Sequence, residues 1–451
     1  MTASRDSEDP TPQLARALIR SLTRGTAIAA GVRYIHVGHE RWLAAQIELL
    51  SEIGEDGHSD TKFVRGAYGA GKSHFLSVVQ DRARQLNWAT SHVECKIDGV
   101  QIDRFETLYP KIVSKLTTHD AITGASDEGR DGATDPLRHL LDKWAVGLLE
   151  KVGVKENAVR KPFDAEERVY ATLESGLMRS NMPAEFVKAL AIYVRAYLTQ
   201  DNETLETVAG WLRGVDARVR LPGAYLQKPR LGGTSPKGGF LDLKPIGTGT
   251  ARDIMRGILW LVKSSGYSGL VLCIDEIEEL AKLGNRRRQD QALQALRDYV
   301  DNNGEFRHFC MYLAATPEMF EGQDYFPRYA ALSTRIDPVS EQINWRAPVI
   351  DLDRTPLGQA EMLEMAIRLR RVYSVAYGPA APDRVSEEVL RRFITDVGAS
   401  RFRVAKPRLL ARIVIDELER ARQQGDEYKA PADVKSRVAS VAERIAKEAA
   451  L

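Results

Sequence analysis

The sequence has few cysteines, no long apolar run and almost no excess of one charge. Its three cysteines are Cys95, Cys273 and Cys310. They are far apart, and no pair has metal-ligand spacing, which favours buried, reduced thiols in a cytoplasmic protein. No stretch approaches the roughly 18 apolar residues of a membrane span, and the polar first residues lack the apolar centre of a secretion signal. These absences argue against a disulfide scaffold and a membrane protein, and they predict a soluble, cytoplasmic one.

Charge is nearly balanced along the chain. Lys and Arg number 64 and Asp and Glu number 62, which gives a formal net charge of +2. A balanced protein holds nucleic acid only through a local basic patch. Hydrophobic residues make up 43% of the 451 residues, so an ordinary globular core is expected, and the length suits about two or three domains.

One short glycine-rich segment, FVRGAYGAGKSHFL at residues 63–76, contains the pattern G-x-x-x-x-G-K-S. In this pattern backbone N–H groups surround phosphates, the lysine reaches the β- and γ-phosphates, and the serine hydroxyl binds magnesium. A strand at 61–65 should enter the loop and a helix at 73–85 should leave it, whereas a chance glycine turn requires neither. The sequence therefore predicts ATP and Mg²⁺. The predicted nucleotide-binding residues are Gly66, Ala67, Tyr68, Gly69, Ala70, Gly71, Lys72, Ser73 and His74.

A second motif ends an apolar run at 269–274, which is typical of a strand buried on both faces. The next residues are Asp275 and Glu276. ATP hydrolysis needs a carboxylate that helps to hold magnesium and a group that orients the attacking water. We therefore assign Asp275, with Ser73, to Mg²⁺ and Glu276 to the water, while a helix cap at the strand end is the alternative.

Other side chains are candidates for contacts with the γ-phosphate. Thr316 follows an apolar run at 309–315, and it either places its hydroxyl near the γ-phosphate or forms a turn before Pro317. Arg328 and Arg335 are expected on one face of one helix, where an arginine can reach the nucleotide of a neighbouring subunit in a homo-oligomer. Arg408, in the first turn of a helix, is expected to report the nucleotide state. Solvated or ion-paired surface arginines are the alternative.

The arrangement of these segments predicts an α/β protein with an open parallel sheet, because its buried strands each end in polar residues. An N-terminal helical segment is expected over 1–30, a phosphate-loop ATPase domain over 31–350 and a helical domain over 351–451. Within the ATPase domain we expect a helical insertion at about 117–216. A long loop at 221–245 is either a contact arm or a solvated linker. The expected strands are 61–65, 91–97, 269–274 and 309–315.

Contact with DNA requires basic side chains that neutralise phosphates. Arg286, Arg287 and Arg288, expected in a loop after the Asp-Glu motif, are the first candidates. Acidic residues lie close to them in sequence, so a solvated or ion-paired surface loop is the favoured alternative. A second, weaker set is Lys228, Arg230 and Lys237 in the long loop.

The order of these motifs resembles that of the AAA+ ATPases, nearest to their origin-recognition and clamp-loader members. Six segments of the chain lie in order between residues 34 and 336. They are YIHVGHERWLA, FVRGAYGAGKSHFL, GWLRG, GYSGLVLCIDEIEEL, RRRQDQALQALRDYVD and RYAALSTRI. These segments are similar to the BrxD family, the ATP-binding proteins of BREX bacteriophage-defence systems.

The resemblance implies an AAA+ core with a parallel sheet, a helical insertion and a C-terminal helical lid. It also implies that Lys72, Asp275, Glu276 and Arg335 are functional residues in an ATPase that works beside other defence proteins on DNA. Two functions stay open at this point. The chain is either an oligomeric ATPase that remodels or moves along DNA, or a nucleotide-dependent assembly switch or scaffold with slow hydrolysis. A kinase for a small substrate is a third and less favoured reading.

Overall fold

The computed structural model describes most of the chain. The described residues are 9–24, 31–123, 135–153, 162–179, 181–214, 217–229, 239–302, 304–336, 342–399 and 406–449. The chain divides into two compact units. Unit 1 comprises Met1–Leu49, Lys62–Arg82 and Tyr312–Leu451, and unit 2 comprises Leu50–Thr61 and Ala83–Met311.

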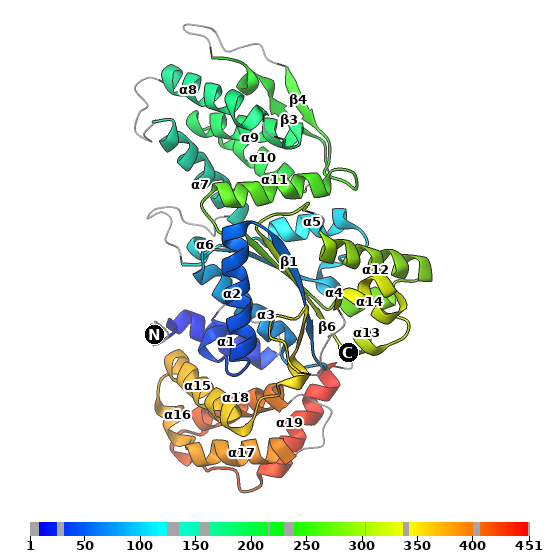
Figure 1. Ribbon diagram of the computed structural model, residues 1–451. Coiled ribbons are helices and arrows are strands. Elements are labelled where there is room, and N and C mark those ends of the chain that lie inside the picture. Colours follow the sequence, from blue (N-terminus) through cyan, green and yellow to red (C-terminus); the bar gives the residue numbers. More distant parts are fainter. Residues whose placement is uncertain are drawn as a thin grey trace. The chain divides into compact units, whose positions relative to one another are not determined.

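The predicted motifs lie at the ends of strands in a five-stranded parallel sheet (Figure 1). Its strand order is β2-β5-β6-β1-β7. Every residue of β5 and β6 is buried, which explains their unbroken apolar sequences. The predicted α/β class is confirmed, and β7 is a short strand that the sequence did not reveal. The strands are β1 (Ser59–Arg65), β2 (Ala89–Glu94), β5 (Leu270–Asp275), β6 (Phe309–Ala315) and β7 (Val349–Asp351).

The second strand ends earlier than its sequence indicated. We expected a strand over 91–97, but β2 ends at Glu94 and the next residues form the short helix α4 (Cys95–Asp98). The Asp98 carboxylate accepts a 2.9 Å hydrogen bond from the Glu94 N–H, which turns the chain at this point. Ile97 is consequently 74% exposed instead of lying in the sheet.

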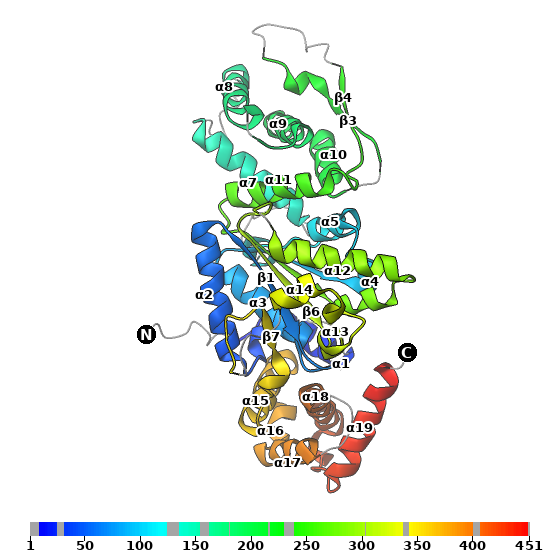
Figure 2. The ribbon, with the colours of Figure 1, turned by 45° about the vertical axis from the view of Figure 1, so that its right-hand side comes forward.

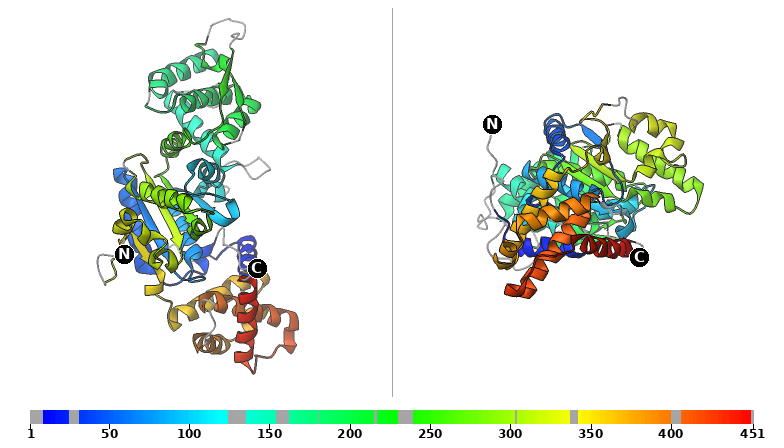
Figure 3. Two further views of the ribbon diagram at one scale, coloured as in Figure 1. Left: turned by 90° about the vertical axis from the view of Figure 1, so that its right-hand side faces the viewer. Right: turned by 90° about the horizontal axis from the view of Figure 1, so that it is seen from below.

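The C-terminal helices of unit 1 pack together with the N-terminal helix α1 (Figures 1 and 3). Their shared apolar core includes Leu18, Leu369 and Leu410, each at most 1% exposed. Within this bundle Glu417 is fully buried and forms ion pairs with two arginines. Its ion pair with Arg420 has an N–O distance of 2.6 Å. The helices are α1 (Pro12–Arg24), α15 (Gln359–Tyr377), α16 (Ala380–Arg384), α17 (Glu387–Ala399), α18 (Lys406–Gln424) and α19 (Val434–Ala449).

Unit 2 contains a block of helices and a small two-stranded antiparallel sheet (Figure 2). The predicted helical character of 117–216 agrees with the helices that are described there. The helices of the block and its flanks are α5 (Phe105–Ser114), α6 (His119–Thr123), α7 (Pro136–Lys151), α8 (Pro162–Ser175), α9 (Ala184–Leu198), α10 (Asn202–Leu212) and α11 (Ala251–Ser264).

The described ends of the stretch at 221–245 contain regular structure rather than loop alone. It contains parts of the antiparallel strands β3 (Val219–Pro222) and β4 (Phe240–Leu243), together with the 3₁₀ helix η3 (Gly223–Leu226). The buried guanidinium of Arg195 holds this segment by donating to the Tyr225 and Gln227 carbonyl oxygens. A single long-range anchor of this kind leaves no local sequence pattern. Two of the weaker DNA candidates, Arg230 and Lys237, lie outside the described residues.

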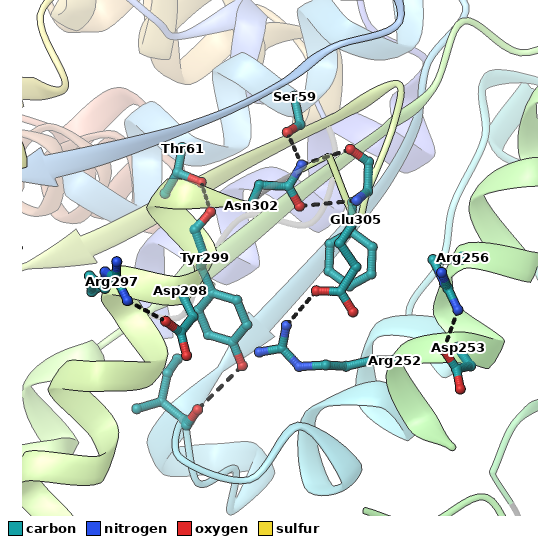
Figure 4. Close-up of polar contacts among 12 residues, drawn as sticks. Ser59, Thr61, Arg252, Asp253, Arg256, Arg297, Asp298, Tyr299, Asn302 and Glu305 are labelled. Atoms are coloured by element: carbon teal, nitrogen blue, oxygen red, sulfur yellow. Dashed lines mark hydrogen bonds and ion pairs between the residues drawn. The ribbon is translucent and has the colours of Figure 1, made fainter. Parts of the chain in front are cut away.

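The end of helix α12 (Arg286–Asp301) is fixed by side-chain contacts in unit 2 (Figure 4). Asn302 adopts a positive φ of 44°, and its side chain bonds to both the N–H and the C=O of Phe306, at 3.0 and 2.8 Å. Arg252 pairs with Glu305 at 2.7 Å. These contacts hold the turn that leads from α12 to β6.

Two expectations from composition can be compared with the described residues. Cys95, Cys273 and Cys310 are buried thiols that are not in disulfides, as expected. Burial raises the pKa of the Cys95 thiol to about 12, so this thiol stays protonated at neutral pH. Within the described ranges, no helix combines the length and the apolar character that a membrane crossing needs.

Candidate functional site: a phosphate loop and an acidic strand end

The glycine-rich loop connects β1 to α3 (Lys72–Gln85). Gly69 and Gly71 have φ angles of 80° and 101°, which residues with side chains rarely adopt. The helix begins at Lys72 directly after the turn and is 14 residues long, so its positive end and its first N–H groups face the loop. Strand, glycine turn and helix therefore follow one another in the order that the motif requires.

Lys72 lies inside this loop rather than in solvent. Lys72 is only 8% exposed. The ammonium donates to the carbonyl oxygens of Gly66 at 2.9 Å and of Ala67 at 3.4 Å. Both acceptors are neutral, and a phosphate oxygen with a full charge is a stronger partner for an ammonium group. An anionic ligand can therefore replace these carbonyl oxygens as the partner of the Lys72 ammonium.

The start of the loop is bonded to the segment that follows β7. Arg65 lies opposite Asp351 in the β1–β7 pairing, and the Nη1 and Oδ2 atoms of this ion pair are 3.1 Å apart. The Ala67 N–H donates to Asp353 Oδ2 at 2.9 Å, and Asp353 belongs to the 3₁₀ helix η6 (Leu352–Arg354). Sequence reasoning missed Asp353, because the D-x-D pattern gains meaning only once β7 is known to pair with β1.

The first turn of α3 contacts another segment of unit 1 through two histidines. His36 Nδ1 lies 3.1 Å from His74 Nε2, and the two rings are stacked with centroids 5.2 Å apart. Burial lowers the pKa of His74 to about 3, with a smaller contribution from His36. Burial, followed by the charge of His39, lowers the pKa of His36 to about 4. Both rings are neutral at pH 7, so one donates to the other.

His36 also connects this turn to α15. Its carbonyl oxygen accepts a 2.6 Å hydrogen bond from Arg368 Nη1. His74, which the sequence assigned to the nucleotide, therefore lies in a chain of contacts from the phosphate loop to the C-terminal helices of the same unit. His36 was missed as a partner, because nothing in the segment YIHVGHERWLA indicates which residue its histidines meet.

The end of β5 in unit 2 carries the two predicted acidic residues. Asp275 is the last residue of the buried strand and is 3% exposed, and its Oδ1 accepts the Glu276 N–H at 2.9 Å. Glu276 has a left-handed backbone, with φ 58° and ψ 42°. Its Oε2 is buried and has no hydrogen-bond partner among the described residues. Burial, followed by the charge of Asp275, raises the pKa of the Glu276 carboxyl.

The backbone and burial of Glu276 leave its carboxyl open to a ligand. Non-glycine residues in the left-handed region cost free energy, and they persist only where the surrounding fold holds them in place. A carboxylate without a partner can accept a proton or a hydrogen bond from a water molecule. The Glu276 carboxyl can therefore accept a hydrogen bond from a water molecule, and its catalytic role stays a prediction.

A third carboxyl group lies beside this pair. Glu94, the last residue of β2, is opposite Asp275 in the β2–β5 ladder. Burial, followed by the charge of Asp275, raises the pKa of Glu94. The sequence did not single out Glu94, because the predicted strand continued through it to residue 97. Only the register of the two strands shows that it meets the acidic motif.

Thr316 and Arg408 occupy the local positions that the sequence predicted. Thr316 follows β6 and precedes the short helix α13 (Pro317–Glu321), and its side chain makes no capping hydrogen bond. Arg408 is in the first turn of α18. These placements leave both roles as predictions.

Arg328 and Arg335 do not share a helix. Arg328 ends the 3₁₀ helix η5 (Phe326–Arg328), whereas Arg335 lies in α14 (Ala330–Ile336). Tyr329, with φ −105° and ψ 88°, separates the two elements. The expectation of two arginines on one helical face is therefore wrong, since the chain leaves helical geometry between them. Arg335 donates to the Ala331 carbonyl oxygen of its own helix.

The three consecutive arginines begin α12 and are not in a loop. Asn285 caps this helix by accepting the Arg288 N–H at 2.9 Å. Arg288 also forms an ion pair with the nearly buried Asp103, at 3.1 Å, and donates to Gln101. The loop expectation is therefore wrong, because Asn285 is a strong cap. Arg286 and Arg287 are exposed, and they remain candidates for phosphate contacts.

Comparison with known proteins gives the family of the chain. No curated protein matches the sequence significantly. A protein-family model described as BREX system ATP-binding protein BrxC/D matches residues 11–220 and 243–436. This match covers most of the chain and includes the phosphate loop, the end of β5 and most of the C-terminal helices. The chain therefore belongs to the BrxC/D family of BREX system ATP-binding proteins.

Proposed function

We propose that this chain is a magnesium-dependent ATP hydrolase of the AAA+ class that acts on DNA or on DNA-bound partners in bacterial anti-phage defence. Membership of a family of BREX ATP-binding proteins supports ATP as the ligand and other defence-system proteins as partners. The observation that carries the proposal is the phosphate loop, in which Lys72 lies inside a glycine turn at the start of α3. The proposed place of action is the cytoplasm.

In this proposal the phosphate loop binds ATP through its backbone N–H groups and the Lys72 ammonium. The Ser73 hydroxyl and the Asp275 carboxylate would supply oxygen donors to Mg²⁺, which prefers hard oxygen ligands. The bound ion would neutralise charge that develops during phosphoryl transfer. Lys72, whose present acceptors are neutral carbonyls, can turn to the charged phosphates.

Glu276 then orients the attacking water and accepts its hydrogen bond. The buried, unpartnered Oε2 and the left-handed backbone support this role. Thr316 offers its hydroxyl to the γ-phosphate. Arg335 acts on the nucleotide of a neighbouring copy in a homo-oligomer, where an arginine stabilises transition-state charge. Arg408, in the C-terminal helices, reports the presence of the γ-phosphate.

Contact with DNA is assigned to Arg286 and Arg287, which are exposed in the first turn of α12. They neutralise phosphates without reading bases. Arg288 has a weaker claim, because its guanidinium is paired with Asp103. Binding through so few contacts should depend only moderately on salt concentration.

The second candidate function is a nucleotide-dependent assembly switch with slow hydrolysis. It is favoured by the two links that leave the phosphate loop within unit 1, one from Ala67 to Asp353 and one from His74 through His36 to Arg368. Such links allow a ligand at the loop to change the C-terminal helices without rapid turnover.

Steady-state ATP hydrolysis by the purified protein, with double-stranded, single-stranded or no DNA, tests the proposal. We expect DNA to stimulate turnover, and we expect Glu276→Gln to lower turnover by about 10² to 10³ while ATP still binds. Light scattering of the same samples reports assembly, and Arg335→Ala should assemble with ATP but hydrolyse it poorly. Tight ATP binding and ATP-dependent assembly with negligible turnover on any DNA would favour the switch instead.

A further inference from the structure

A carboxylate reaches the phosphate loop from outside the loop. Asp353 Oδ2 accepts the N–H of Ala67, the second residue of the G-x-x-x-x-G-K-S motif, at 2.9 Å. Asp353 is itself positioned, because its own N–H donates to Asp351 Oδ1 at 3.1 Å and Asp351 pairs with Arg65. The pairing of β1 with β7 therefore places this carboxylate at the loop.

The Asp353 carboxylate forms no ion pair with a lysine or arginine within the described part of the chain. Lys72 donates to two carbonyl oxygens, and Arg65 forms ion pairs with Asp351 and Glu321. The partner of Asp353 is a neutral backbone amide, so a full negative charge remains beside the loop.

A nucleotide brings further negative charge to the same loop. Like charges repel, and the energy is reduced but not abolished by solvent screening at exposed positions. The repulsion grows with the number of phosphates, so ATP is affected more than ADP, and ADP more than AMP.

Building on the ATP binding proposed above, we infer that Asp353 is a specificity-determining residue of the phosphate loop. It lowers the affinity of the loop for nucleotides in proportion to their phosphate charge. The coupling is reciprocal, because a ligand that is bound less tightly in the presence of the Asp353–Ala67 contact must also weaken that contact.

The same contact carries the effect toward the C-terminal helices of unit 1. Asp353 belongs to η6, and the next residue after this element, Thr355, has its hydroxyl 3.2 Å from both His39 Nδ1 and Trp42 Nε1. The chain then enters α15 at Gln359. Weakening the bond to Ala67 loosens the segment through which the phosphate loop is joined to α15.

Titration of the full chain with ATP, ADP and AMP, in the presence of Mg²⁺, tests the inference through binding rather than turnover. Asp353→Asn retains an oxygen that can accept the Ala67 N–H but removes the charge. We expect it to bind ATP about three- to five-fold more tightly than the wild type, ADP with a smaller gain and AMP with almost none. Asp353→Ala, which also removes the acceptor, should give the same order of gains.

Asp426→Asn is the matched control. Asp426 is an exposed carboxylate in η7 (Gly425–Glu427) that pairs with Arg384, and its substitution changes the net charge by the same amount. It should leave all three affinities unchanged. Unchanged or weaker ATP binding by Asp353→Asn, or an equal gain for ATP, ADP and AMP, would overturn the inference alone. Failure of the wild type to bind ATP would overturn the proposed function as well.

Discussion

The phosphate loop and the end of β5 carry the same proposed reaction but are built in different ways. In the loop, the charged and polar groups have partners, since Lys72 donates to carbonyl oxygens and the Ala67 N–H donates to Asp353. At the end of β5, Glu276 combines a left-handed backbone with a buried carboxyl oxygen that lacks a partner among the described residues. Buried polar atoms normally find partners, and strained residues persist only where the fold imposes them.

This difference indicates that the two regions have different roles in the proposed reaction. Lys72, whose acceptors are neutral carbonyl oxygens, can exchange them for phosphate oxygens at little cost. A buried carboxyl oxygen without a partner can accept a hydrogen bond from water, but its missing hydrogen bond lowers the stability of the folded chain even when no ligand is bound. Binding is therefore expected to depend on the loop, and turnover on the strand end.

The largest expected effect separates these two roles. Lys72→Ala removes the ammonium that meets the phosphates, and we expect ATP affinity to fall by about 10- to 100-fold, since hydrogen bonds between charged groups are the strong ones. Glu276→Gln should change ATP affinity by less than about three-fold, because its carboxyl acts on water. Titration with a fluorescent ATP analogue measures both. Equal losses of affinity in the two variants would remove the distinction between the two regions.

A smaller effect concerns the backbone at Glu276. Glycine adopts φ 58° without strain, and Glu276 Oε2 has no hydrogen-bond partner among the described residues, so Glu276→Gly should stabilise the protein by about 1 kcal/mol while abolishing turnover. Asn302 is the matched contrast, since it also has a positive φ but bonds to Phe306 through its side chain. Asn302→Gly should therefore destabilise by about 1 kcal/mol.

Thermal unfolding of the two glycine variants beside the wild type provides the measurement. The midpoint should rise for Glu276→Gly and fall for Asn302→Gly. A fall in both would mean that the backbone at Glu276 is relaxed and that its conformation reflects packing rather than function.

Local sequence patterns predicted the loop, the buried strands β5 and β6, and the C-terminal helices. These features depend on residues that are neighbours in the chain, such as the glycines that precede Lys72 or the unbroken apolar runs of the strands. The residues that were missed depend on long-range pairing. Glu94 meets Asp275 through the register of two strands, and Asp353 meets Ala67 because β7 pairs with β1.

The three arginines at the start of α12 also show the limit of local sequence patterns. The sequence grouped Arg286, Arg287 and Arg288 as one basic cluster. In the described structure, Asp103, which is far away in the chain, forms an ion pair with the last of them, Arg288. A cap at Asn285 could have been read locally, and it would have placed all three in a helix.

The smallest expected effect concerns the two histidines beside the loop. Burial holds the pKa of His36 near 4, whereas a histidine in the unfolded chain titrates near 6.5. Between these values the unfolded chain binds more protons, so the folded state loses stability as the pH falls from about 6.5 toward 4. His36→Gln keeps a neutral hydrogen-bonding side chain next to His74 and removes this titration. We expect the variant to lose roughly 1 kcal/mol less stability than the wild type at about pH 5.5.

Thermal unfolding midpoints at about pH 7.5 and 5.5 compare the two proteins. The midpoint of the wild type should fall more on acidification than that of His36→Gln, because only the wild type has the buried His36 ring to protonate on unfolding. Equal acid sensitivity would show that the His36–His74 contact is protonated or solvated in the folded protein. In that case the contact would be too weak to join the phosphate loop to Arg368 and α15, and the link through Asp353 would have to carry that coupling alone.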